Sequence, residues 1–170
     1  MRQTVTLDIE TTGLGWIEHQ ITCVCAKDSD GNKFREAVTT ACSEADLIIH
    51  FGGWLYPRKD NLLLSFNGKG FDLPFILGRA ALLDLDVSKL KFMLQMDHED
   101  LMLITKKWVS LNAMAKILKL PTKNGNGRDA IAMYHAGEYE KLLDYCMGDV
   151  LLTEAIYLRR KQLEPVEALV

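Results

Sequence analysis

The sequence predicts an α/β fold in which a mixed β-sheet is flanked by helices. Three segments with strand character come first, and a helix, a fourth strand and further helices follow them along the chain. The order β-β-β-α-β-α is typical of a mixed sheet covered by helices. The chain has 170 residues and contains no linker or internal repeat. It is therefore expected to form a single domain over residues 1–170.

Alternating and β-branched residues predict the first strand over residues 4–10. Residues 21–26 and 33–38 have the same character. The Asp30-Gly31 turn signal between these two segments favours a hairpin. The three strands are therefore expected to form an antiparallel meander.

The rest of the chain alternates one more strand with helices. The run NLLLSF at residues 61–66 is almost continuously apolar, as expected of a strand that is covered on both faces. Ser43 is a good N-cap residue for the helix that precedes this strand. Residues 121–128 are polar and glycine-rich, and they predict a mobile loop. Helical spacing extends over five segments, residues 40–56, 72–83, 110–118, 129–136 and 138–162.

The composition is that of a soluble globular protein, with 48% hydrophobic and 25% charged residues. The net charge of −3 argues against a large basic surface for nucleic acid. The four cysteines have no CxxC spacing, and Cys23 and Cys25 lie in an apolar run that favours buried thiols. We find no signal peptide and no apolar run of about 20 residues. A cytoplasmic protein without a membrane segment is therefore expected.

Two carboxylates lie on the first predicted strand, in the segment Asp8-Ile9-Glu10. The period of two places Asp8 and Glu10 on the same face of the strand. A cation between them would relieve their repulsion. Two surface acids at a strand edge are the alternative interpretation.

A third acid, Asp72, follows the fourth strand in the segment FNGKGFD. The two glycines allow a tight turn from the strand into the next helix. Asp72 would then stand at the start of that helix, where capping is an alternative role. Asn67 likewise suits any turn.

The last helix contains Tyr145 and Asp149, which share one face because they are four residues apart. Their neighbours include several leucines, so the acid requires a partner unless this face is solvated. Acids from the first strand, the strand–helix junction and the last helix would meet only in a tertiary cluster. Four oxygen ligands without His or Cys select Mg²⁺ or Mn²⁺. A pair of such ions suits in-line phosphoryl displacement.

The segments DIETTGL, NGKGFD and YCMGD resemble the three exonuclease motifs of the DEDD superfamily. The tyrosine four residues before the last aspartate resembles the tyrosine subclass. The segments FNGKGFDLPFI and HEDLM are most similar to the exonuclease domain of family B DNA polymerases and its stand-alone relatives. The resemblance spans about residues 4–158. It implies a ribonuclease H-like fold, with an antiparallel meander plus parallel strands, and 3′–5′ exonuclease activity that releases nucleoside monophosphates from single-stranded nucleic acid.

The resemblance also implies a role for each motif residue. Asp8, Glu10 and Asp149 would bind one metal ion, and Asp8 would bridge to a second ion that Asp72 supports. The implied cofactor is two Mg²⁺ or Mn²⁺ ions. Tyr145 would orient the attacking water.

Four further residues are implied to contact the substrate. Thr11 would meet the terminal 3′-hydroxyl, and Leu14 would wedge against the last base. Asn67 and Phe71 would line the path of the strand. The polymerase-like segments favour DNA over RNA, although an RNA-trimming exonuclease would use the same acids.

Three other functions fit the motifs less well. An aspartate-nucleophile phosphatase would need an aspartate where Glu10 stands, and it would leave Tyr145 and Asp149 without a role. A non-cleaving nucleic-acid-binding module of the same fold is disfavoured because all four acids are intact. An endonuclease of the ribonuclease H type is disfavoured by the tyrosine–aspartate pair.

Substrate grip must come from the small core, from a homo-oligomer or from an accessory partner, because the sequence contains no polymerase domain. Lys119, Lys123 and Arg128 would form either a local basic patch or a solvated loop. Asp100, in HEDLM, is expected to fix local structure and not to bind metal.

Overall fold

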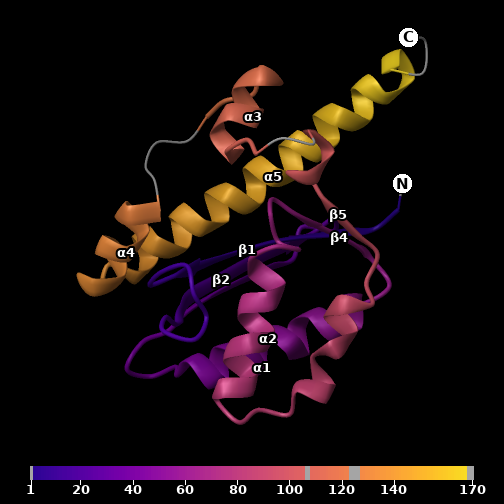
Figure 1. Ribbon diagram of the computed structural model, residues 1–170. Helices are drawn as coiled ribbons and strands as arrows, with labels where there is room; N and C mark the ends of the chain where they lie inside the picture. Colours follow the sequence, from indigo (N-terminus) through magenta and orange to yellow (C-terminus); the bar gives the residue numbers. More distant parts are fainter. Residues whose placement is uncertain (1, 106–107, 123–126, 168–170) are drawn as a thin grey trace.

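A five-stranded mixed sheet forms the centre of the computed structural model (Figure 1), which describes residues 2–105, 108–122 and 127–167. The strand order is β3-β2-β1-β4-β5. The first three strands are antiparallel, and β4 and β5 extend the sheet in parallel with β1. This arrangement confirms the predicted mixed sheet and its meander. The strands are β1 (Thr4–Thr11), β2 (Ile21–Asp28), β3 (Lys33–Ala37), β4 (Leu62–Ser65) and β5 (His98–Asp100).

Helices cover both faces of the sheet, as Figure 1 shows. Two helices, α1 and α2, lie on one face, and the long helix α5 crosses the other face with α3 and α4 beside it. The helices are α1 (Glu44–Leu55), α2 (Asp72–Leu82), α3 (Leu111–Ile117), α4 (Gly127–His135) and α5 (Tyr139–Glu167). In the described ranges, short 3₁₀ helices lie in the connections between these elements: η1 (Tyr56–Arg58), η2 (Val87–Lys89), η3 (Lys91–Leu94) and η4 (Leu103–Thr105).

The alternation of side chains along β1 decides which residues reach which face. Val5, Leu7 and Ile9 are buried in the core that contains residues of α1 and α2. Because successive side chains point to opposite faces, Asp8 and Glu10 point toward the face that α5 covers. The strand thus buries its apolar residues and directs its carboxylates to the other side.

Strand β2 alternates in the same way. Val24 and Ala26 belong to the core under α1 and α2, whereas Cys23 and Cys25 pack against α5. Both thiols are fully buried and free, as predicted. The two apolar cores therefore lie on opposite faces of the same sheet.

The boundaries of three predicted helices needed correction. The last helix, α5, ends at Glu167, beyond the predicted end near residue 162. Ser43 caps α1 as predicted, since its hydroxyl accepts a hydrogen bond from Asp46 N at 3.2 Å and Asp46 Oδ2 accepts one from Ser43 N at 3.1 Å. This capping box fixes the helix start at Glu44, after the predicted start at Thr40. The predicted loop over residues 121–128 ends earlier than expected, because α4 begins at Gly127. Residues 123–126 lie outside the described part of the chain.

Strand β5 was not predicted. It has three residues, and its segment His98–Asp100 has no apolar run. Its pairing with β4 brings Asp100 beside Ser65. In the described ranges, no helix is long and apolar enough to cross a membrane.

Candidate metal centre

Three carboxylates meet between β1 and α5. Asp8 and Glu10 come from β1, and Asp149 comes from α5, 139 residues further along the chain than Glu10. One oxygen from each side chain lies within 4.8 Å of an oxygen from each of the others. Asp149 is buried, whereas Asp8 and Glu10 are half-buried. Three carboxylates at this separation repel each other, and a cation among them would offset that repulsion.

Asp72 stands next to this group but outside it. It is the first residue of α2, and its Oδ1 accepts a hydrogen bond from Ile9 N at 3.2 Å. That bond ties the start of α2 to β1, between the two strand acids. Its side chain is only 4% exposed. Burial, with smaller contributions from the charges of Asp100 and Asp149, raises the pKa of Asp72 from 3.8 to about 7.

The turn between β4 and α2 is fixed by Asp100. Asp100 Oδ1 accepts a hydrogen bond from Asn67 N at 2.8 Å, and Oδ2 accepts one from Lys69 N at 2.9 Å. Asn67 has a φ of 71°, a left-handed conformation that asparagine tolerates better than most residues. The predicted structural role of Asp100 is confirmed by these bonds. The sequence did not reveal that this role depends on β5.

Tyr145 lies on α5 one turn before Asp149 and is half-buried. It packs against the core formed with Cys23 and Cys25. It therefore lies on the same helix as Asp149, and part of its ring belongs to the core beneath that helix. The i and i+4 relation predicted for this pair follows directly from the helix.

The four predicted substrate residues lie at the end of β1, in the loop that follows it, and in the turn between β4 and α2. Thr11 ends β1, and its hydroxyl donates to Gly13 O at 2.6 Å. Leu14 is 87% exposed, which leaves it accessible to a ligand. Asn67 lies in the turn held by Asp100. Phe71 is half-buried and contacts Phe75, with ring centroids 5.3 Å apart, so part of its surface belongs to the core.

Sequence reasoning gave Cys146 no role, although it lies inside the third motif. Its thiol is fully buried and donates to both Asp8 O and Asp8 Oδ2 at 3.4 Å. Cys146 also interacts with Cys23 and Cys25. Hydrogen bonds of Cys25 with Cys146 and with Cys23 lower the pKa of Cys25 to about 5. Burial raises the pKa of Cys146 well above its usual range. Cys146 thus positions a candidate ligand and packs α5 onto the sheet.

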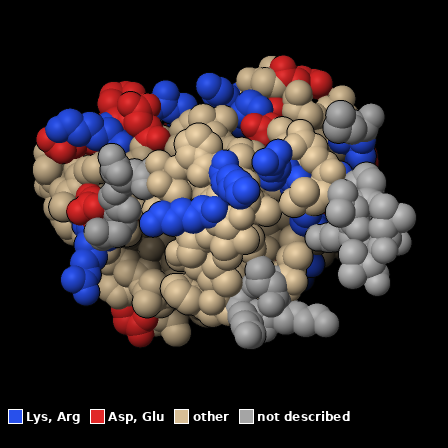
Figure 2. Space-filling view, turned by 90° about the horizontal axis from the view of Figure 1, so that it is seen from above, with Lys and Arg blue, Asp and Glu red and all other residues tan. Residues whose placement is uncertain are grey.

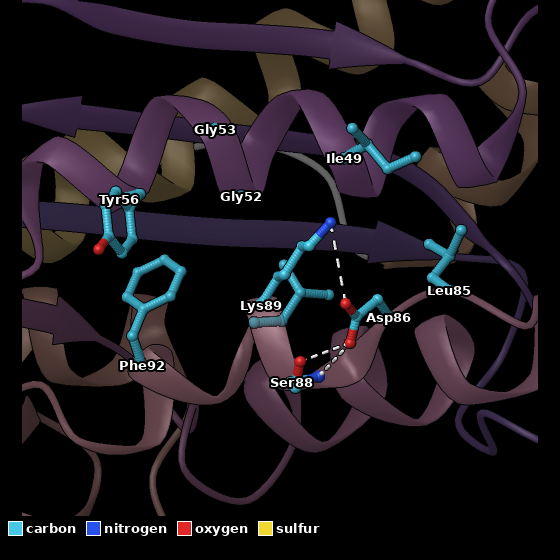
Figure 3. Close-up of a pocket in the computed structure, with 10 residues that line it drawn as sticks. Ile49, Gly52, Gly53, Tyr56, Leu85, Asp86, Ser88, Lys89 and Phe92 are labelled. Carbon is cyan, nitrogen blue, oxygen red and sulfur yellow. Dashed lines mark hydrogen bonds and ion pairs between the residues drawn. The ribbon is translucent and has the colours of Figure 1, made fainter.

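A pocket of about 710 Å³ lies elsewhere, between α1 and the 3₁₀ helices η2 and η3 (Figure 3). Ile49, Tyr56 and Phe92 give it a largely apolar lining. Its one carboxylate, Asp86, is already engaged by Ser88 and Lys89. We assign the candidate site to the carboxylates and not to this pocket, because metal-assisted phosphoryl chemistry requires several carboxylate ligands and the single carboxylate of this lining is already paired.

In the face seen from above in Figure 2, a few basic side chains lie near the centre among uncharged residues, and acidic side chains lie mostly toward the edge. Lys119 and Arg128, two residues of the predicted basic patch, are exposed. Lys123, the third, lies outside the described residues. An acidic chain can therefore still present a locally basic surface to a phosphate backbone.

Comparisons with known proteins agree with this fold. Residues 17–166 match a family model described as a predicted 3′-5′ exonuclease related to the exonuclease domain of PolB. Among solved structures, the family B DNA polymerase of the hyperthermophilic archaeon Pyrobaculum calidifontis is similar, with a TM-score of 0.79 and 16% sequence identity. The similarity covers 97% of this chain and 25% of the polymerase. No curated protein matches the chain in sequence.

The structural likeness at this identity establishes the fold alone. The sequence match begins at residue 17, so Asp8 and Glu10 precede it, and their inclusion in the site depends on the geometry of β1 and α5. The matched span nevertheless includes α5 and the turn between β4 and α2, as well as most of the sheet. This chain belongs to the family of predicted 3′-5′ exonucleases related to the exonuclease domain of PolB.

Proposed function

We propose that the chain is a metal-dependent 3′–5′ exonuclease, formed as one domain over residues 1–170, that releases nucleoside monophosphates from the 3′ end of single-stranded nucleic acid. The observation that carries the proposal is the meeting of Asp8, Glu10 and Asp149 within 4.8 Å. These residues come from the two ends of the chain, so only the complete fold brings them together. The family supports the same reaction class.

The donor set fits Mg²⁺ or Mn²⁺. All three ligands are carboxylates, and hard divalent ions prefer oxygen donors. In our proposal Asp8, Glu10 and Asp149 hold one ion, and Asp8 and Asp72 hold a second. Such ions, when bound, supply a nucleophile at neutral pH and stabilise the charge that develops on the phosphate. The high pKa of Asp72 is consistent with a carboxyl that ionises when a cation arrives.

Tyr145 is proposed to orient the attacking water by a hydrogen bond. Its position one turn before Asp149 supports this role. A phenol is a poor base at neutral pH, because the ordinary pKa of tyrosine is about 10. Positioning is therefore the function we assign to its hydroxyl.

Substrate contacts are assigned to the end of β1, the loop that follows it, and the turn between β4 and α2. Leu14 is exposed at the end of β1 and is proposed to wedge against the terminal base, with Thr11 near the 3′-hydroxyl. Asn67 and Phe71 are proposed to line the strand's path, where an aromatic ring can stack on a base. We favour DNA over RNA as the substrate. We also propose that a homo-oligomer or an accessory partner contributes further substrate contacts.

Digestion of end-labelled single-stranded DNA and RNA, with Mg²⁺, Mn²⁺ or EDTA, tests the proposal. The Asp149→Asn variant is the matched control, because it keeps the size of the side chain and removes its charge. We expect stepwise shortening from the 3′ end that requires metal and is lost in the variant. If RNA were digested faster than DNA, RNA and not DNA would be the preferred substrate. If the protein bound nucleic acid but did not cleave it under any metal condition, it would be a nucleic-acid-binding module, and the proposed activity would be refuted.

A further inference from the structure

A second group of metal-ligating side chains lies between β3 and α1. It consists of Glu36, Cys42 and His50, whose ligand atoms all lie within 4.8 Å of one another. Neither the sequence motifs nor the family match accounts for it. We propose that these three residues bind a divalent transition-metal ion of the zinc type, at a site separate from the Asp8, Glu10 and Asp149 carboxylates.

Two of the ligand side chains, Glu36 and His50, have nearly the spacing of neighbouring ligands in a tetrahedral zinc site. With bonds of about 2.0–2.3 Å, neighbouring ligand atoms in such a site lie about 3.3–3.8 Å apart. His50 Nδ1 lies 3.0 Å from Glu36 Oε1 and 3.1 Å from Oε2. The pair would have to open by roughly 0.2–0.8 Å to admit the ion.

The type of ligand selects a different metal from that expected between β1 and α5. A thiolate, an imidazole and a carboxylate together favour a borderline-soft ion such as Zn²⁺ over Mg²⁺. Three protein ligands leave one tetrahedral position for water. The charge of Asp46 also acts on both Cys42 and His50, so the surroundings favour a cation.

The backbone around Cys42 is already ordered by hydrogen bonds. Thr39 N donates to Cys42 O at 2.9 Å, and Cys42 N donates to Thr39 Oγ1 at 3.2 Å. Ser43, the next residue, is the N-cap of α1, and His50 lies two helical turns beyond it. A cation would therefore meet ligands on two fixed elements, an edge strand and a capped helix.

The group lies on the opposite face of the sheet from the candidate catalytic acids. Glu36 pairs with Val24, which belongs to the core under α1 and α2, and Phe34 on the same side of β3 packs against that core. Asp8 and Glu10 point to the α5 face. A bound ion would therefore fasten the edge strand β3 to α1 without contacting the catalytic group.

The site is open to ions from solution. The side chain of His50 is 55% exposed, and that of Glu36 is 28% exposed. Cys42 is half-buried and free. Burial, followed by the charge of Glu36, raises the pKa of Cys42 to about 11. Metal binding should consequently release the thiol proton.

Titration of the full chain with Co²⁺ and Zn²⁺, in excess Mg²⁺ to fill the carboxylate group, tests the site. Co²⁺ bound by a thiolate gives a charge-transfer band in the near ultraviolet, which carboxylate ligands do not. We expect one such ion per chain, displaced by Zn²⁺, and a rise in Tm on Zn²⁺ binding. The band should disappear in Cys42→Ser, and Zn²⁺ affinity should fall at least ~10-fold in His50→Ala.

Two controls separate this site from the rest of the chain. His135→Ala removes another exposed histidine and Asp149→Asn alters the carboxylate group, and both should bind Co²⁺ as the unmodified protein does. Circular dichroism checks the fold of Cys42→Ser. If Cys42→Ser fails to fold, His50→Ala still tests the site, because the His50 side chain is exposed and its removal should leave the fold intact. Absence of the band in the unmodified protein, its persistence in Cys42→Ser, or unchanged Zn²⁺ affinity in His50→Ala would overturn the proposal.

Discussion

Replacing Asp72 by asparagine should stabilise the metal-free protein at neutral and alkaline pH. The Asp72 carboxyl is buried and has a pKa of about 7, compared with an ordinary value of 3.8. Above pH 7 the folded protein must therefore hold a buried charge. Asparagine has the same shape and no charge, and its side-chain oxygen can still accept the hydrogen bond from Ile9 N.

The magnitude follows from the difference between the two pKa values. Between pH 3.8 and 7 the folded state binds more protons at Asp72 than the unfolded state does, so the free energy of unfolding falls as pH rises. The destabilisation is absent below pH 3.8 and complete above pH 7. A change of about 3 pH units corresponds to at most about 4 kcal/mol. For a chain of this size, each kcal/mol shifts Tm by roughly 2–4 °C.

Thermal unfolding in EDTA, measured at pH 5 and pH 8, tests this reasoning. We expect Tm of the unmodified protein to fall more steeply between these values than Tm of Asp72→Asn, which should be the more stable protein at pH 8. Asp60→Asn, a change at an exposed acid, is the matched control and should retain the steep dependence. Mn²⁺ should stabilise the unmodified protein at pH 8, because it binds only the folded state. Equal pH dependence in the unmodified protein and Asp72→Asn would refute a raised pKa at this carboxyl.

Three further predictions concern the proposed activity and the turn beside it. Asp8→Ala or Asp149→Ala should lower single-turnover digestion by several orders of magnitude, while circular dichroism shows an intact fold; near-normal turnover would remove that residue from the site. Tyr145→Phe should lower the rate roughly 10- to 1000-fold, the scale of a positioned hydrogen-bonding group, with Mn²⁺ affinity by calorimetry almost unchanged. An unchanged rate would reduce Tyr145 to a packing role. Asp100→Asn should cost about 1–3 kcal/mol in urea unfolding, because an amide cannot accept at both side-chain atoms; equal stability would contradict its part in fixing the turn.

The sequence predicted the elements whose pattern is local. Residues 4–10 alternate and 61–66 are apolar, and both became strands of the central sheet. Ser43 caps its helix because the capping signal needs only the next three residues. Strand β5 escaped prediction because its three residues have no such signal, and their extended conformation depends on pairing with β4. The local pattern therefore did not predict the parallel pairing of β5 with β4.

The same distinction applies to the candidate site. Asp8 and Glu10 were predicted together because they are two residues apart on a strand, and Asp149 with Tyr145 because they are four apart on a helix. The hydrogen bond from Cys146 to Asp8 joins residues 138 positions apart, and no spacing encodes it. Glu36, Cys42 and His50 likewise come from a strand, a turn and a helix, so they lack the spacing of a metal motif. The contact between such residues depends on how the elements pack, which the sequence pattern does not specify.

The packing of α5 has a consequence for how stability and activity are coupled. Asp149 reaches Asp8 and Glu10 only while α5 lies on the sheet. Cys146 packs in the core beneath α5 and also hydrogen-bonds to Asp8. Without metal, the repulsion among the carboxylates opposes this docking, whereas the apolar contacts of Leu142, Cys146 and Val150 favour it. Metal binding adds to the apolar contacts and removes the repulsion. The ligands and the core of α5 therefore stabilise each other, and a change that loosens the α5 core should weaken metal binding even where it touches no ligand.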